Sequence, residues 1–542
     1  MSSDLIKPVL VRDSRLNGLS DYQTVGVQQG PANNTYQRFK AISSSASNMV
    51  FNVTIPSEET VINREILLST TVNFTIKDPK NTLRIGQSSA LNQFPFSQLV
   101  QTMTLSINNS TVSTQLQDLL PALTRMMNID DLQKYNGSTP TMDDCGYFSY
   151  NDAVASTNNP FNAFTSASYD KYNLPRGCQL ISGNQDQNDK TIFYFTVKLI
   201  EPLFISPMIF GNTLYNGEGI FGVNSLNLQL ALDTTAKRFF TASANKNDGL
   251  TISLGGQNGT EPFIDPELLM NFMSVQPTQM VSSKSVLPYT DYSLYKSSSA
   301  TQIALQKGSP TTLQSNNIQL NQLPSRFFIF VRKPMNEMTI FDSNAFLTIN
   351  SISIQLNTSS GLLSSCNQVE LWKLSVANGL ISSWNEFSGK VNVVDTSTTE
   401  ISSLATSGSM LVLNPAKDLS LPSYLAPLSI GQFSFSFNIN VTSYYDNEIR
   451  PEICVVCEND GIFVTQQGTS QVQLGLLSKQ MVLDTQERNK QTAIGSDEHQ
   501  EMVGGSIIQQ GLTSMKKMCK RQGGAMSAGS MSAGRSRLSK YT

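Results

Sequence analysis

Histidine is nearly absent from this chain of 542 residues, which restricts the chemistry that the chain can perform. The one histidine, His499, lies in a polar run of Ser, Asp, Glu and Gln at residues 496–501. A serine or cysteine nucleophile activated by histidine would have to use His499, and such a site requires a preorganised surrounding. The run is typical of a solvated linker. We therefore predict that the chain is not an enzyme.

Cysteine is also scarce, and its spacing argues against both disulfides and metal. The six cysteines are scattered over a long chain, so they imply no disulfide framework. Cys454 and Cys457 have the C-x-x-C spacing, but residues three apart on a strand point to opposite faces, and no second pair or histidine is nearby. We expect two buried core thiols. The acid pairs at 130–131 and 143–144 are expected to be solvated, so no metal site is predicted.

One stretch has the spacing of a cofactor motif but not its context. Residues 217–222, Gly-Glu-Gly-Ile-Phe-Gly, match the G-x-G-x-x-G of a dinucleotide-binding loop. Such a loop must open a helix whose N-terminus faces the pyrophosphate, whereas a period-two strand follows here. We interpret the stretch as a turn. No cofactor and no small-molecule substrate are predicted.

Charged residues make up 15% of the chain, well below the usual quarter, and apolar runs are short. No run of 18 apolar residues occurs, so no membrane span is expected. Residues 1–18 lack the apolar core of a signal peptide, and we expect a protein made and kept in the reducing cytoplasm or nucleus. Sheets with many small polar residues and few charges suit surfaces that meet other protein subunits.

Short segments in which apolar and polar residues alternate recur along the chain and predict an all-β protein. In the first half they lie at residues 49–55, 71–76, 102–107, 192–200, 226–232, 250–254 and 272–280. In the second half they lie at 351–356 and 433–441, with a hairpin at 453–464 whose turn is Asn459-Asp460-Gly461. Neither half has alternating βαβ units. The pattern predicts two β-sandwich domains, divided near Ser285.

A further strand is predicted at residues 327–331, Phe-Phe-Ile-Phe-Val, between Pro324 and Pro334. This run is too short for a buried helix, so we expect a core strand that opens the second half. Trp372 and Trp384 fall in one short region. We expect both tryptophans to be buried and to anchor the second core.

A short helix is predicted in the first half, where apolar residues recur at helical spacing from Leu116 to Met127. Asp118 is placed to cap it, and Pro121 is tolerable only near its first turn. The following residues, 128–189, have little periodicity. They predict an elaborated loop exposed on one face.

The two ends of the chain differ from its middle. Residues 1–45 are polar, and we expect an arm that orders only against a partner. Domains are predicted at 46–285 and 286–485, followed by a flexible tail at 486–542. This tail holds the only basic patch, which suits binding to genome phosphates or to an internal partner, although a solubilising terminus is the alternative. Its basic residues are Lys516, Lys517, Lys520, Arg521, Arg535, Arg537 and Lys540.

Several motifs follow one another in a fixed order through most of residues 48–465. They lie at residues 50–64, 94–123, 201–207 (Glu-Pro-Leu-Phe-Ile-Ser-Pro), 287–289, 318–332, 361–365, 378–389 and 460–463. In order and spacing they resemble the double jelly-roll major capsid proteins of the adenovirus-like lineage of DNA viruses, of the polinton-like virus, adintovirus and virophage type.

This resemblance implies an all-β fold of two consecutive eight-stranded antiparallel jelly rolls with short helices and long surface loops. It implies a structural protein of the virion, in which a homotrimer forms a pseudo-hexagonal capsomer and capsomers tile an icosahedral shell. The implied partners are neighbouring capsomers, penton and minor capsid proteins, and the viral genome through the tail. Residues 502–506, Met-Val-Gly-Gly-Ser, are similar to sites cut by adenovirus-type maturation proteases, which implies cleavage between Gly505 and Ser506.

Two other readings remain open from the sequence. One is a virus coat protein with a single jelly roll and a projecting domain. The other is a carbohydrate-binding β-sandwich protein, which needs aromatic residues clustered on a concave sheet. The second ranks lower, because only two tryptophans occur and both are expected to be buried.

Overall fold

The computed structural model describes most of the chain up to residue 484. The described residues are 6–11, 23–28, 33–83, 89–128, 131–132, 134–135, 137–141, 180–208, 219–242, 249–274, 284–297, 303–394, 401–444 and 449–484. Met1–Leu483 forms one compact unit. Among the described residues, no helix is long and apolar enough to cross a membrane.

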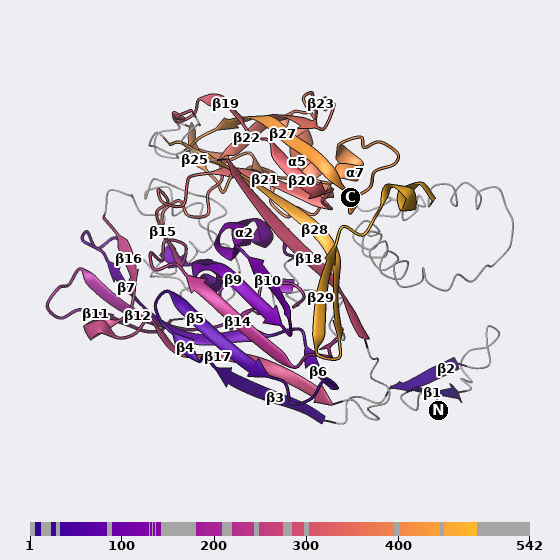
Figure 1. Cartoon of the computed structure of the whole chain (residues 1–542). Helices are drawn as coiled ribbons and strands as arrows, with labels where there is room; N and C mark the ends of the chain where they lie inside the picture. The colour runs from indigo at the N-terminus through magenta and orange to yellow at the C-terminus, as the bar shows by residue number, and fades with distance from the viewer. Residues whose placement is uncertain are drawn as a thin grey trace, which may run out of the picture. The chain divides into compact units, whose positions relative to one another are not determined.

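In the first half, two antiparallel sheets contribute to one core (Figure 1). The five-stranded sheet has the order β10-β9-β14-β5-β4, with β4 (Ser43–Ser44), β5 (Asn48–Thr54), β9 (Val100–Ile107), β10 (Ser110–Thr114) and β14 (Ser225–Leu232). The eight-stranded sheet has the order β11-β12-β7-β17-β6-β13, with β16 on β7 and β3 on β17. Its strands are β3 (Asn33–Lys40), β6 (Thr60–Asn63), β7 (Leu67–Lys77), β11 (Leu180–Gln185), β12 (Ile192–Pro202), β13 (Gly219–Ile220), β16 (Thr251–Leu254) and β17 (Phe263–Ser274).

The second half repeats this arrangement with two five-stranded sheets around a second core. One sheet has the order β18-β28-β21-β26 with β29 on β28, from β18 (Lys284–Ser297), β21 (Arg326–Arg332), β26 (Met410–Leu413), β28 (Glu452–Gln466) and β29 (Thr469–Leu474). The other has the order β19-β27-β22-β23 with β20 on β27, from β19 (Pro310–Gln314), β20 (Ile318–Gln322), β22 (Thr348–Leu356), β23 (Ser359–Leu362) and β27 (Ile430–Thr442). The rings of Phe327 and Phe435 stack between the two sheets at a centroid distance of 4.4 Å.

Smaller elements connect and cover these sheets. The helices are α1 (Pro95–Leu99), α2 (Leu116–Leu123), α5 (Gln368–Ala377), α6 (Trp384–Phe387) and α7 (Pro415–Asp418), with 3₁₀ turns η1 (Thr124–Met126) and η5 (Gln257–Gly259). Three two-stranded sheets pair β1 (Ile6–Val11) with β2 (Gln23–Gln28), β8 (Ser89–Leu91) with β15 (Phe240–Ala242), and β24 (Lys390–Val394) with β25 (Ile401–Ala405).

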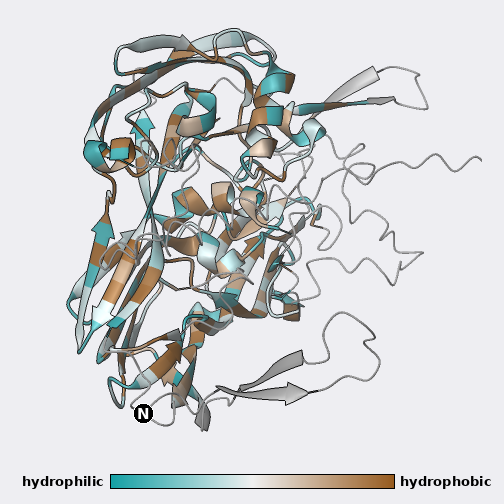
Figure 2. Ribbon diagram, turned by 90° about the vertical axis from the view of Figure 1, so that its right-hand side faces the viewer, coloured by the Kyte–Doolittle hydropathy of each residue, from teal (hydrophilic) through white to brown (hydrophobic). Residues whose placement is uncertain are grey.

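The strands form where the sequence alternates, because alternate side chains of a strand reach opposite faces of the sheet. Along β5, Met49, Phe51 and Val53 are buried, and the residues between them are more exposed. Along β14, buried leucines alternate with exposed polar residues in the same way. Hydrophobic and hydrophilic segments accordingly alternate along many ribbons in Figure 2. The predicted all-β class and the sandwich in each half are confirmed.

One long ribbon, made of β18 and β28, joins the two cores. The two strands pair antiparallel from Lys284 with Gln466 to Ser297 with Ile453 (Figure 1). At one end of the ribbon, Leu287, Tyr289 and Phe463 belong to the first core. At the other end, residues 453–457 belong to the second core. The two sandwiches therefore share a continuous pair of strands.

The hairpin predicted at residues 453–464 is wrong. Asn459, Asp460 and Gly461 lie within the uninterrupted strand β28, where they pair with β18. Gly461 also pairs with Leu474 of β29, and a Cβ atom at residue 461 would lie 2.3 Å from the carbonyl oxygen of Gln473. Gly461 thus permits the close approach of the β29 backbone. In the sequence, the tripeptide Asn459-Asp460-Gly461 resembles a turn.

Helix α2 lies between the two cores. Leu116 and Leu120, one turn apart, belong to the first core, whereas Leu119 and Ala122 belong to the second. The predicted helix is confirmed, but the predicted cap is wrong. The residue before the helix is Gln115, no side chain caps it, and the Asp118 carboxylate instead contacts two cations of the second half.

Three further expectations need correction. The strand at residues 327–331 is buried as predicted, but β18, β19 and β20 precede it, so it does not open the second half. Trp372 and Trp384 are half-buried at the edge of the core, in edge-to-face contact at 5.8 Å. Within the predicted arm, β3 and β4 are ordered on β17 and β5 of the same chain. Most of the loop predicted at 128–189 lies outside the described residues.

The shared ribbon predicts that damage to the first core will also destabilise the second. Phe463→Ala removes a fully buried ring from the first core and should lower the free energy of unfolding by about 3–5 kcal/mol. Both tryptophans lie in the second half, so their fluorescence reports on the second core alone. In urea titrations, the fluorescence midpoint should fall together with the far-UV circular dichroism midpoint. An unchanged fluorescence midpoint would show that the halves unfold independently.

Candidate functional site

A cluster of four charged residues joins α2 to the second half, and all of them except Lys296 are largely buried. We call Asp118, Lys296, Arg332 and Glu452 the seam cluster. Lys296 Nζ lies 2.6 Å from Asp118 Oδ2, and Arg332 Nη2 donates to Glu452 Oε2 at 3.0 Å and also to Asp118 Oδ1. The Arg332 side chain is fully buried. Burial acts to raise the pKa of Asp118, but the charges of Arg332 and Lys296 outweigh it and hold that pKa below its usual value.

A second polar contact between the halves is centred on Arg238. This guanidinium, almost fully buried, donates from Nη1 to the Gln117 carbonyl at 3.1 Å and from Nη2 to Asn344 Oδ1 at 3.3 Å. Asn344 Nδ2 donates in turn to Asn92 Oδ1 at 2.6 Å. Arg238 and Asn92 of the first half therefore form these hydrogen bonds with Asn344 only when the two halves are docked.

A third cluster lies on the ribbon itself. Glu458 of β28 accepts two hydrogen bonds from Arg326, one of them from Nη2 to Oε1 at 2.7 Å. Next to it, the Asp460 carboxylate accepts hydrogen bonds from the hydroxyls of Thr290 and Ser325. Burial, reinforced by the Glu458 charge, raises the pKa of Asp460 to about 6.

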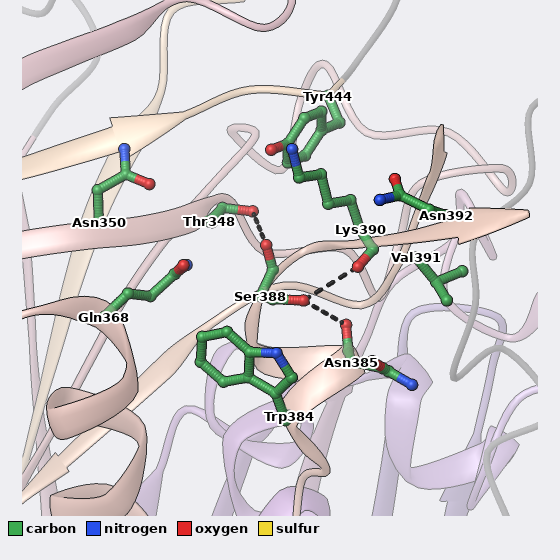
Figure 3. Close-up of a pocket in the computed structure, with 10 residues that line it drawn as sticks. All are labelled: Thr348, Asn350, Gln368, Trp384, Asn385, Ser388, Lys390, Val391, Asn392 and Tyr444. Carbon is green, nitrogen blue, oxygen red and sulfur yellow. Dashed lines mark hydrogen bonds between the residues drawn. The ribbon is translucent and has the colours of Figure 1, made fainter. Parts of the chain in front are cut away.

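The described residues also form a polar pocket in the second half (Figure 3). Its cavity volume is ≈ 370 Å³. It lies among β22, the start of β24 and the first residues of α5 and α6. The lining residues are Thr348, Asn350, Gln368, Trp384, Asn385, Ser388, Lys390, Val391, Asn392 and Tyr444.

The pocket floor is held by hydrogen bonds around Ser388. The Ser388 hydroxyl shares its one proton between the carbonyls of Asn385 at 3.1 Å and Lys390 at 3.0 Å. The Thr348 hydroxyl donates to the Ser388 carbonyl at 3.4 Å (Figure 3). Gly389 has a φ of +73°, and a Cβ atom there would lie 1.6 Å from Thr348 Oγ1. Only glycine allows this approach, so the floor depends on its identity.

The seven basic tail residues, Gly505 and Ser506 all lie outside the described residues, as does His499. Cys454 and Cys457 are buried core thiols, as expected, and burial raises the pKa of Cys454 to about 12. The described part of the predicted glycine motif is Gly219–Ile220 in β13, followed by Gly222 with a φ of +73°. Among the described residues, no group of three His, Cys, Asp or Glu side chains is arranged to hold a metal ion.

Few of these ion pairs could be predicted from the sequence. Arg326 and Arg332 flank the core strand at 327–331 and are spaced six residues apart, which puts both on one face of β21. That spacing could have predicted that the two arginines share one face of the strand. Their acidic partners come from β28 and α2, which no local pattern connects to β21.

Comparison with known proteins gives consistent matches over both halves. A family model described as the first domain of the Sputnik virophage major capsid protein matches residues 3–273. A model described as the C-terminal domain of major capsid protein V20 matches residues 292–461. Together the two matches cover most of the chain and leave residues 274–291 between them.

Individual relatives cover nearly the whole chain. The putative capsid protein V20 of Sputnik virophage is 27% identical over an alignment 524 residues long, and the match covers 92% of this chain and 84% of that protein. A chain from the cryo-electron microscopy structure of Sputnik virophage superposes with a TM-score of 0.74 at 25% identity, covering 93% of this chain and 97% of that one. The mavirus major capsid protein superposes with a TM-score of 0.68 at 14% identity, covering 93% and 100%.

The raised pKa of Asp460 predicts a pH dependence of stability. Because the folded-state pKa of about 6 exceeds the unfolded value of about 3.9, the unfolded chain releases this proton first. The wild-type protein therefore loses stability from Asp460 as pH rises from about 4 to about 6. Asp460→Asn should remove this loss. The free energy of unfolding of the variant should therefore rise relative to that of the wild type as pH rises from about 4 to about 6. Urea unfolding of both proteins from pH 4 to pH 7 measures the difference; a difference independent of pH would contradict the assignment.

Proposed function

Because the chain belongs to the Sputnik virophage major capsid protein family, we propose that it forms homotrimeric, pseudo-hexagonal capsomers that tile an icosahedral shell. It is a double jelly-roll major capsid protein and a structural component of the virion. The family consists of structural proteins rather than enzymes. The observation that carries the proposal is the pair of similarly built sandwiches in one chain.

The pseudo-hexagonal outline follows from that repetition. Three copies of a chain with two sandwiches present six similar units around a threefold axis. The two sandwiches must keep one fixed arrangement for this to work, and the shared ribbon, α2 and the seam cluster supply that rigidity. The single-barrel alternative is disfavoured, because both halves are sandwiches.

Contacts between chains need apolar surface, and the described residues expose some. Ile303, Ile430 and Val376 are 60%, 60% and 42% exposed. Only 15% of the residues are charged, which reduces the free-energy cost of desolvating the surface around them. Obligate interfaces commonly bury more than about 2,000 Å². We propose that such faces contact trimer mates, neighbouring capsomers, and penton and minor capsid proteins.

For the tail, we propose contact with the genome or with an internal partner. Its basic residues, Lys516, Lys517, Lys520, Arg521, Arg535, Arg537 and Lys540, are accompanied by no acid from Leu512 onward. Such a segment binds phosphates mainly by releasing counterions. Cleavage between Gly505 and Ser506 remains a proposal on the protease-like residues 502–506, and an intact mass from particles that still includes residues 506–542 would eliminate it.

The trimer proposal predicts a solution mass of about 179 kDa, three times the chain mass of 59.5 kDa. Multi-angle light scattering coupled to gel filtration measures this directly. Negative-stain electron microscopy of the same peak should show a pseudo-hexagonal outline. A stable monomer or dimer would contradict the proposal.

The tail proposal predicts that DNA binding depends on salt and on residues 506–542. With seven phosphate contacts at most, a plot of log affinity against log salt should have a slope of at most about −6 for duplex DNA. A chain ending at Gly505 should lose most of this binding. A full-length variant with the seven basic residues changed to Gln is the matched control and should lose it equally. Equal binding by all three proteins would refute a genome contact.

A further inference from the structure

The pocket of Figure 3 has a lining that restricts its ligand. None of its ten lining residues is acidic, so it does not suit a metal ion or another cation. Only Lys390 is charged, and its ammonium lies 5.9 Å from the centre of the Tyr444 ring. One lysine is a weak basis for binding a polyphosphate, which needs several convergent donors. The other polar groups are neutral amides and hydroxyls.

Two amides on one side of the pocket differ in how they are held. Asn350 donates from Nδ2 to Asn440 Oδ1 at 2.8 Å and Thr442 Oγ1 at 2.9 Å, which fixes its orientation. Gln368 Nε2 is buried without a hydrogen-bond partner in the described structure. A buried donor left unsatisfied costs about 1–3 kcal/mol, so a ligand that accepts from Gln368 gains by removing this cost. Figure 3 shows both amides on the same side of the cavity.

An aromatic surface completes the lining. Trp384 begins α6 and is half-buried, and Trp372 packs against it edge to face. Trp372 donates from Nε1 to the Ser382 carbonyl at 3.0 Å, which holds the supporting ring in place. The pocket therefore combines an indole with neutral amides and hydroxyls on a rigid floor. A sugar ring fits this combination, because it has C–H groups on one face and hydroxyls around its edge.

From this arrangement we propose that the pocket binds a neutral hexose unit of a glycan, with Trp384 against the ring and Gln368 donating to a hydroxyl. The cavity of ≈ 370 Å³ lies at the small end of ligand pockets, roughly 300–1,000 Å³, which suits one or two sugar rings. The inference is independent of the capsomer proposal. It rests on the half-buried position of the tryptophans, which the sequence alone did not indicate.

The test uses the full chain and a panel of methyl glycosides: the α and β anomers of methyl glucoside, galactoside and mannoside, and N-acetylglucosamine. Trp384 lines the pocket and the other tryptophan, Trp372, packs against it, so the tryptophan fluorescence of the wild-type chain reports on the pocket. At least one sugar should change that fluorescence with a Kd about millimolar, and should give saturation-transfer NMR signals with the wild-type protein.

Gln368→Met separates binding from folding. Since Gln368 Nε2 is buried without a partner, removing it should not lower the unfolding midpoint and should raise it if anything, while the sugar affinity falls roughly tenfold. Gln355→Met, an exposed site on the strand β22 that supplies Thr348 and Asn350, is the matched control and should bind as the wild type does.

Two outcomes would overturn the proposal. One is the absence of any sugar signal at 50 mM ligand, on the order of tens of times the expected Kd. The other is a signal that Gln368→Met leaves unchanged. A synthetic peptide of residues 486–542 is tested in parallel, because amides and an aromatic ring also suit an extended peptide. Binding of that peptide without binding of any sugar would assign the pocket to protein contacts instead.

Discussion

The structure depends on the continuity of β18 and β28 across both sandwiches. A two-stranded ribbon is only marginally stable alone, but here each end is buried in a different core. Leu287 and Phe463 at one end, and Ile453 at the other, therefore belong to one continuous hydrogen-bonded pair of strands. Bending the ribbon would break backbone hydrogen bonds and expose apolar side chains in both halves. The two sandwiches are consequently fixed by the same interactions that fold them.

Buried charges make this arrangement specific. Removing Arg332, Asp118 and Glu452 from water costs several kcal/mol per ion, and only well-placed opposite charges offset that cost. Hydrophobic contacts between α2 and the second core tolerate small shifts. The Arg332 guanidinium does not, because a shift would leave it unpaired in the interior. Apolar contacts thus supply stability, and the seam cluster selects one relative placement of the halves.

Much of the fold was predictable because strand formation here follows local alternation. The runs in β5, β9, β14, β22 and β27 each bury one face, and the sequence shows this directly. The ribbon was missed because Asn459-Asp460-Gly461 has the composition of a turn, while its conformation is decided by pairing with β18 and β29. The cap assigned to Asp118 failed for a similar reason: its partners are more than 170 residues away.

The candidate sites were less predictable than the fold. The polar pocket draws its lining from β22, α5, α6, β24 and Tyr444, so no contiguous motif encodes it. The tryptophans were expected in the core because large aromatic residues are mostly buried, yet both lie at its edge. The basic tail was recognisable from composition alone, because a segment that acts by charge needs no fixed geometry.

The late position of Phe463 in the chain also delays completion of the first core during synthesis. Most of the first core is translated before Ser285, but Phe463 leaves the ribosome 178 residues later. At roughly 5–20 residues per second, that delay is about 10–40 s. Throughout it, the nascent first core lacks the Phe463 ring, and the apolar side chains that this ring covers stay exposed. A chaperone that covers this apolar surface until Phe463 packs should therefore raise the yield of folded protein.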